Sequence, residues 1–63
     1  MEAATALWNG NEKKFESVEN AVIFVMESLS AADQATVMVQ TDTRALGLTE
    51  IESVYDSIKG KKP

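Results

Sequence analysis

The sequence predicts a small α+β domain in which a β-hairpin, a helix, a strand and a second helix follow one another, the order ββαβα. Three features predict this fold: the dipeptide Asn9-Gly10 between two short segments, an apolar helical run after Ser17, and a second helical stripe after Gly47. We expect a small antiparallel or mixed sheet with both helices packed on one of its faces.

The hairpin prediction starts from Asn9-Gly10, the dipeptide that best tolerates the positive φ angles of a type I′ turn. A two-residue loop pairs Trp8 with Asn11 and carries the pairing outward along both strands. The residues expected on the inner face are Ala4, Ala6, Trp8 and Phe15, and those expected on the outer face are Thr5, Leu7, Glu12 and Lys14. An alternative keeps only Thr5 to Trp8 as strand and leaves residues 9–16 as a loop.

The first helix is expected from about Val18 to Leu29, with Ser17 as its cap. Its main apolar face comprises Val18, Ala21, Val22, Val25, Met26 and Leu29. Ile23 and Phe24 instead flank the narrow polar stripe, and a helix this apolar is usually covered on more than one side. A buried strand over residues 21–26 is the alternative, since short apolar runs are ambiguous.

The segment from Ser30 to Asp33 can form a capped turn, and residues 36–41 then alternate as a strand does. We expect Val37 and Val39 to point inward and Met38 outward. An exposed Met38 beside Ile23 or Phe24 would suit a dimer interface.

Residues 42–46 are expected to form a turn or a short helical segment that Gly47 stops. Thr49 and Glu52 have the spacing of a capping box at the start of the second helix. The residues expected to face inward along this helix are Ile51, Val54, Tyr55 and Ile58. Gly60 ends the helix, and residues 61–63 are expected to be a frayed basic tail after a single domain of residues 1–60.

The stretch from Leu46 to Thr49, with the apolar positions after it, resembles the second half of a DNA-binding helix-turn-helix. That motif has an apolar residue about six places after its glycine, where this chain has Ser53. Its recognition helix normally offers Arg, Lys, Asn or Gln to base edges. The polar residues here are Glu50, Glu52, Ser53, Asp56 and Ser57. Register and charge therefore favour an ordinary capped amphipathic helix.

Composition narrows the classes of function. The chain has 63 residues, neither cysteine nor histidine, and a net charge of −4. This excludes disulfides, thiolate metal sites and cysteine or histidine nucleophile systems, and the charge weighs against nucleic acid and anionic membranes. The longest apolar run is far too short for a membrane span. We expect a cytoplasmic protein, and a chain this short would gain stability from a second copy.

Candidate sites are few. Glu52 and Asp56 share a helix face but lack a third ligand, so we expect no metal site. The chain has no imidazole to activate a serine or threonine and no glycine-rich phosphate loop, so we expect no catalytic residue and no cofactor. Arg44 could hold an anion together with the amides of the turn at 41–44. Trp8 is a candidate aromatic anchor for a partner, although packing against the first helix is the favoured interpretation.

These observations lead to three hypotheses about function. The first is a non-catalytic homodimer that binds another protein, with Ile23, Phe24 and Met38 as candidate interface residues. The second is a dimeric nucleic-acid-binding regulator. The third is a small anion- or ligand-binding protein that uses Arg44.

Overall fold

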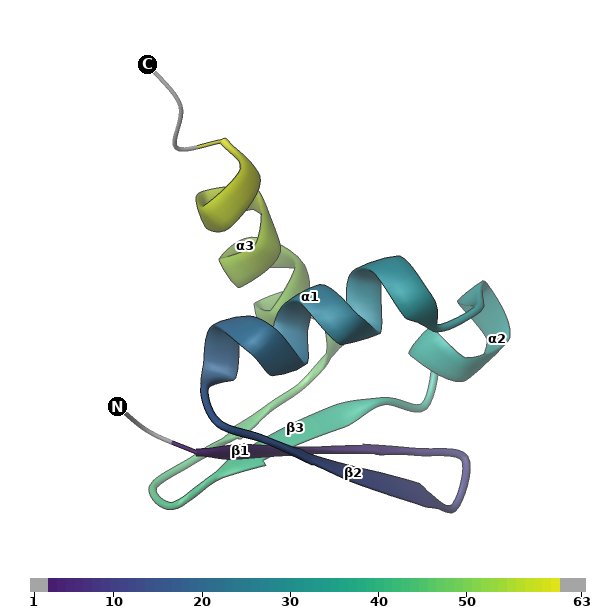
Figure 1. Cartoon of the computed structure of the whole chain (residues 1–63). Coiled ribbons are helices and arrows are strands. Elements are labelled where there is room, and N and C mark those ends of the chain that lie inside the picture. The colour runs from purple at the N-terminus through teal and green to yellow at the C-terminus, as the bar shows by residue number, and fades with distance from the viewer. Residues whose placement is uncertain (1–2, 61–63) are drawn as a thin grey trace.

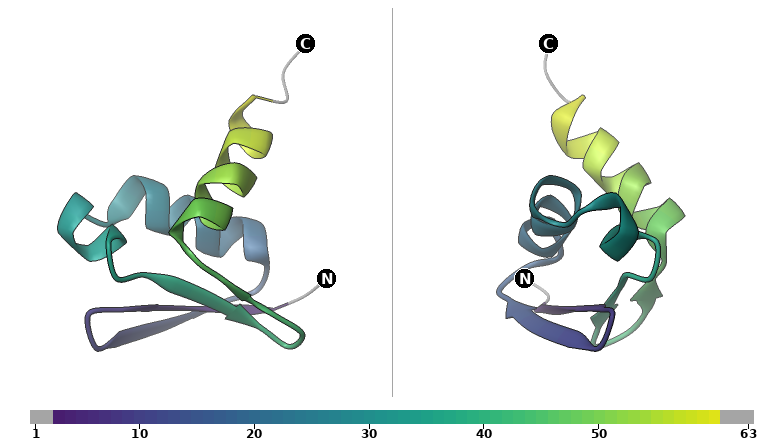
Figure 2. Two further views of the ribbon diagram at one scale, coloured as in Figure 1. Left: turned by 180° about the vertical axis from the view of Figure 1, so that it is seen from behind. Right: turned by 90° about the vertical axis from the view of Figure 1, so that its right-hand side faces the viewer.

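The structure is a computed structural model that describes residues 3–60, and it contains one antiparallel sheet with helices on one face (Figures 1 and 2). The elements in chain order are β1 (Ala4–Trp8), β2 (Asn11–Phe15), α1 (Val18–Ser28), α2 (Ala31–Gln34), β3 (Met38–Thr41), β4 (Ala45–Leu46) and α3 (Leu48–Lys59). The strands lie in the order β2-β1-β3-β4. The α+β class and the one-sided packing of the helices are therefore confirmed.

The N-terminal hairpin has the predicted register. Asn9 and Gly10 both adopt positive φ angles, 46° and 81°, as a type I′ turn requires. Trp8 pairs with Asn11, and Ala4 with Phe15. Residues 11–15 are thus a strand and not a loop, which settles the alternative that the sequence left open.

The sheet has four strands and not the expected three, because the segment 42–46, expected as a turn or a short helical segment, is a turn followed by the strand β4. The backbone N–H of Thr41 donates to the carbonyl of Arg44 at 2.8 Å, and this bond closes a second tight hairpin. The short strand β4 follows and pairs antiparallel with β3. Two residues are too few for a period-two pattern, so the sequence carried no strand signal here.

Helix α1 begins as predicted and ends one residue early. The Ser17 hydroxyl accepts from the backbone N–H of Asn20 at 3.2 Å. At the other end, the side-chain amide of Gln34 donates to the carbonyls of Val25 and Leu29, at 3.1 and 3.0 Å. This side chain therefore satisfies backbone acceptors that the end of a helix leaves without partners.

The order ββαβα agrees only roughly with the structure, since the capped turn expected after Ser30 is present as a third, single-turn helix, α2. Its Ser30 cap accepts from the N–H of Asp33 at 3.3 Å. The Thr36 hydroxyl then donates to the Asp33 carbonyl and accepts from the N–H of Asn9, both at 3.2 Å. These bonds join the segment before β3 to the tip of the first hairpin.

Helix α3 starts before the predicted Thr49 cap. Gly47 is the cap residue, and its N–H donates to the Glu50 carboxylate at 3.1 Å, so Glu50 takes the role expected of Glu52. The carbonyl of Gly47 accepts from Ile51 at 2.9 Å. The chain enters the helix directly from β4 and leaves no room for a further turn. The expectation of a frayed tail concerns residues 61–63, which lie outside the described residues.

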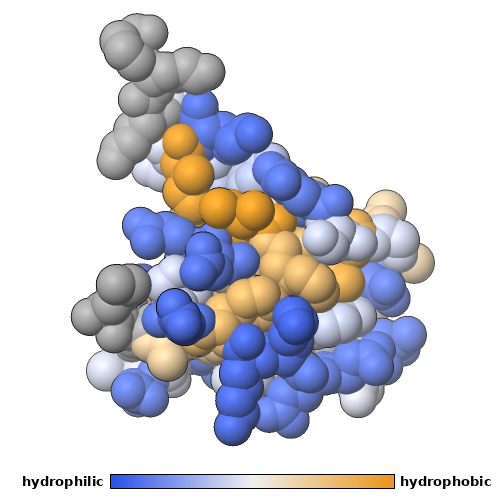
Figure 3. All heavy atoms as spheres, viewed as in Figure 1, coloured by the Kyte–Doolittle hydropathy of each residue, from blue (hydrophilic) through white to orange (hydrophobic). Residues whose placement is uncertain are grey.

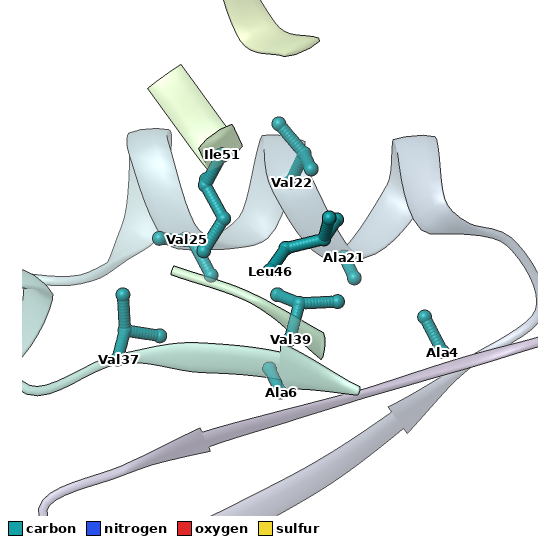
Figure 4. Packing of buried hydrophobic residues seen from close by; sticks show 9 residues of the cluster. All are labelled: Ala4, Ala6, Ala21, Val22, Val25, Val37, Val39, Leu46 and Ile51. Atoms are coloured by element: carbon teal, nitrogen blue, oxygen red, sulfur yellow. The ribbon is translucent and has the colours of Figure 1, made fainter. Parts of the chain in front are cut away.

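The hydrophobic core lies between α1, α3 and the sheet (Figure 4). Its buried side chains are Ala4, Ala6, Ala21, Val22, Val25, Val37, Val39, Leu46 and Ile51. The inward direction predicted for Val37 and Val39 is confirmed, although the regular strand starts only at Met38. Because Ala4 and Ala6 are small, α1 can lie close over β1.

The hairpin turn gives a first prediction. Gly10→Ala should lower the free energy of unfolding by about 1 kcal/mol, because alanine disfavours a positive φ angle while space around the added carbon is open. Gly47→Ala is the matched control: its surroundings are equally open and its φ is −84°. Urea unfolding measures both, and equal losses would contradict a conformational origin.

Candidate functional site

Phe24 lies against the first hairpin. Its ring centroid is 5.2 Å from that of Trp8 and 5.2 Å from that of Phe15, with tilted ring planes. All three side chains are half-buried. Trp8 therefore packs against the first helix, as the favoured interpretation of the sequence had it, and Phe24 covers this end of the core.

Ile23 lies on another side of α1. Glu19 and Glu27 stand one turn before and after it, and residues four apart share a helix face. Glu19 lines a groove with α3, and the Glu27 carboxylate accepts a hydrogen bond from Tyr55 of α3. Ile23 is half-buried and belongs to the side of α1 that faces α3.

Met38 lies on the face of the sheet that points away from the helices. It pairs with Leu7 of β1 and is 40% exposed. The three candidate interface residues, Ile23, Phe24 and Met38, thus lie on three different parts of the surface. The structure brings Met38 together with Leu7 instead, and both line a depression of about 380 Å³ with Trp8.

The outer face of the sheet carries an apolar pair with polar neighbours. Strand alternation and register put Leu7 and Met38 side by side on the two inner strands, β1 and β3, at the end of the face nearest the Asn9-Gly10 turn. The polar residues around them are Thr5, Glu12, Lys14 and Gln40. Figures 1 and 2 show no described segment over this face. We call it the Leu7–Met38 face.

The turn around Arg44 is closed by its own side chains. The Thr41 hydroxyl accepts from the amides of Thr43 and Arg44, at 3.2 and 3.0 Å, and donates to the Arg44 carbonyl at 3.1 Å. The Thr41 side chain therefore caps the turn. Arg44 is exposed and forms no ion pair with the carboxylates of residues 3–60. The two amides expected to help bind an anion are already engaged within the turn.

A cluster of three polar side chains joins α1 to α3. The Tyr55 hydroxyl donates to the Glu27 carboxylate at 2.8 Å, and the Lys59 ammonium lies 3.6 Å from the same oxygen. The hydrogen bond to Glu27 raises the pKa of the Tyr55 phenol above its ordinary value of 10.0, and desolvation adds to the shift. The hydrogen bond from Tyr55 and the ion pair with Lys59 both end on one Glu27 oxygen, so this cluster forms a clamp between α1 and α3.

A second groove of about 320 Å³ lies between the start of α1 and the outer half of α3. Its lining residues are Glu19, Ser53, Val54, Ser57 and Ile58. None of these residues was predicted as a site from the sequence. The sequence pattern that marks the groove is Ser53 and Ser57, four residues apart, beside Val54 and Ile58 at the same spacing. This pattern indicates a groove only when the crossing of α1 and α3 is known.

The described part of the chain has neither a cluster of metal ligands nor a membrane-spanning helix. No three carboxylates of residues 3–60 gather closely enough to hold a metal ion. None of the described helices combines the length and hydropathy that crossing a lipid bilayer requires.

The aromatic contacts give a second prediction. Phe24→Ala should lower the free energy of unfolding by about 2 kcal/mol, because a half-buried ring loses its contacts with Trp8 and Phe15. The fluorescence of Trp8, the single tryptophan, should shift to longer wavelength. Ile23→Ala, a change at the adjacent half-buried position, is the control and should leave the fluorescence unchanged. An unaltered spectrum in Phe24→Ala would contradict this packing.

The clamp gives a third prediction, which depends on pH. Since folding raises the pKa of Tyr55, its contribution to stability is complete below the unfolded-state pKa and is lost as pH rises through the folded-state pKa. The stability advantage of the natural protein over Tyr55→Phe should therefore disappear in strongly alkaline solution. Glu27→Gln should move the absorbance titration of this single tyrosine back toward the ordinary pKa, and an unmoved titration would contradict the hydrogen bond.

Comparison with protein-family models, curated proteins and solved structures finds no match for this chain.

Proposed function

We propose that this protein is a small non-catalytic homodimer that binds other proteins, and that its two copies meet through the Leu7–Met38 face. The observation that carries the proposal is the adjacent apolar pair on an uncovered sheet face, with Met38 40% exposed. Exposed apolar patches rimmed by polar residues mark interaction sites.

The size of the core supports a second copy. Most of the buried apolar side chains among residues 3–60 are alanine or valine, and only Leu46 and Ile51 are larger. A domain this small usually needs a disulfide, a metal or a partner to add to its core. The chain has no cysteine and no histidine, so a partner chain is the simplest source of further buried area.

The edge strands of the sheet are poorly suited to pairing with a second copy, which favours a dimer contact through the Leu7–Met38 face. At one edge β4 has only two residues. At the other edge, β2 exposes Glu12, Lys13 and Lys14. Short and charged edge strands resist edge-to-edge pairing. Glu12 and Lys14 border the Leu7–Met38 face, so a two-fold axis through its centre would let each carboxylate approach a lysine of the other copy.

Composition supports the remaining parts of the proposal. The absence of histidine and cysteine removes the thiol nucleophile and the imidazole that most often activates a serine, which favours a binding role over an enzyme. The net charge of −4 favours protein partners over nucleic acid. We place the protein in the cytoplasm because it has no cysteine, whereas small proteins of oxidising compartments are often stabilised by disulfides.

Sedimentation equilibrium at tens of micromolar tests the dimer. The natural protein should sediment as a dimer, and Met38→Asp as a folded monomer, because a buried carboxylate inside the interface is costly. Asn20→Asp adds the same charge at an exposed position of α1 and should remain dimeric. A monomeric natural protein, or a dimeric Met38→Asp variant, would refute the proposal.

A further inference from the structure

The groove between α1 and α3 has an apolar side, formed by Val54 and Ile58 of α3. Both side chains pack against the core and yet remain partly exposed. In Figure 3 an apolar stripe runs along α3 to its crossing with α1, and hydrophilic residues border it on both sides. This stripe is separate from the Leu7–Met38 face, which lies on the far side of the sheet.

Ser53 and Ser57 form one side of the groove, and their side chains are short. They stand one turn apart on α3 and both line the groove. Because these side chains are short, the backbone of another helix could approach α3 closely beside Val54 and Ile58. An amphipathic helix laid into an apolar groove is a recurring mode of peptide recognition.

The charge around the groove is negative. Glu19 lines it from the first turn of α1, and Glu50 lies one turn before Val54 on the same side of α3. No cation lines the groove among the described residues. Lys59, the basic residue in the last turn of α3, lies instead beside Glu27 at the clamp.

We propose that this groove binds a basic amphipathic helix of a partner protein. Leucine-sized side chains of that helix would lie on Val54 and Ile58, and its lysines or arginines would approach Glu19 and Glu50. A second copy of this chain fits less well, because α3 would bring Glu50, Glu52 and Asp56 to an acidic rim. The inference builds on the proposed protein-binding role and does not depend on the dimer.

Isothermal titration with two synthetic peptides tests the inference. Both are amphipathic helices of about five turns with leucines at i, i+3, i+4 and i+7, and they differ only in carrying lysine or glutamate on the polar face. The lysine peptide should bind, and the glutamate peptide should bind at least about tenfold more weakly. In NMR spectra of the protein, the lysine peptide should shift the amide resonances of Ser53 and Ser57.

Matched variants locate the site. Glu19→Lys should weaken binding of the lysine peptide about tenfold, which equals 1.4 kcal/mol. Asp56→Lys makes the same change of charge on the opposite side of α3 and should keep most of the affinity. Equal losses in both variants, equal binding of both peptides, or no binding at all would overturn the inference.

Sedimentation of the same samples separates the two proposals. A dimer that binds neither peptide overturns only the groove, and a monomer that binds the lysine peptide overturns only the dimer.

Discussion

Helix α1 can lie directly over the sheet because the central strand β1 has alanine at two of the three positions on its inner face, and the third, Trp8, lies at the end of the strand against Phe24 of α1. Ala4 and Ala6 are buried, and α1 contacts β1, β2 and β3 above them. The same helix packs against α3, whose Ile51 is the one fully buried side chain of that helix. Removing α1 would leave the sheet and α3 with little more than the contact to β4, so both layers depend on Ala21, Val22 and Val25.

A core built on one side of a single sheet fixes what remains outside. The inner face of the sheet is covered by α1, whose Phe24 ring lies over Trp8 and Phe15, and by the start of α3. The Leu7–Met38 face receives no cover from residues 3–60, and the outer half of α3 extends past the sheet (Figure 1). The two candidate surfaces are therefore the parts of residues 3–60 that a core on one side of the sheet leaves uncovered.

The parts of the fold that the sequence predicted have local causes. The hairpin register follows from the φ angles that Asn9 and Gly10 tolerate, and the start of α1 follows from the Ser17 hydroxyl. The parts that it missed depend on distant contacts or on competing local choices. Strand β4 exists because β3 pairs with it. Helix α3 could begin at either of two capping pairs of equal spacing, Gly47 with Glu50 or Thr49 with Glu52, and the structure has the first.

The candidate site was harder to predict for the same reason. Leu7 was expected on the outer face, but its contact with Met38 follows from the pairing of β1 with β3, which hairpin geometry alone does not give. Phe24 and Ile23 looked equivalent on the helix, and only the placement of the hairpin and of α3 sends them to different neighbours.

The two surfaces lie on opposite sides of the core, and this arrangement bears on how they would work together. A dimer joined through the Leu7–Met38 face would keep both α1–α3 grooves on its outer sides. Two grooves in one particle could hold two basic helices of the same partner, and the second binding event would then be intramolecular. Modest affinity at each groove would suffice for stable capture, so a domain with a core this small could act as a bivalent binder without a large interface of its own.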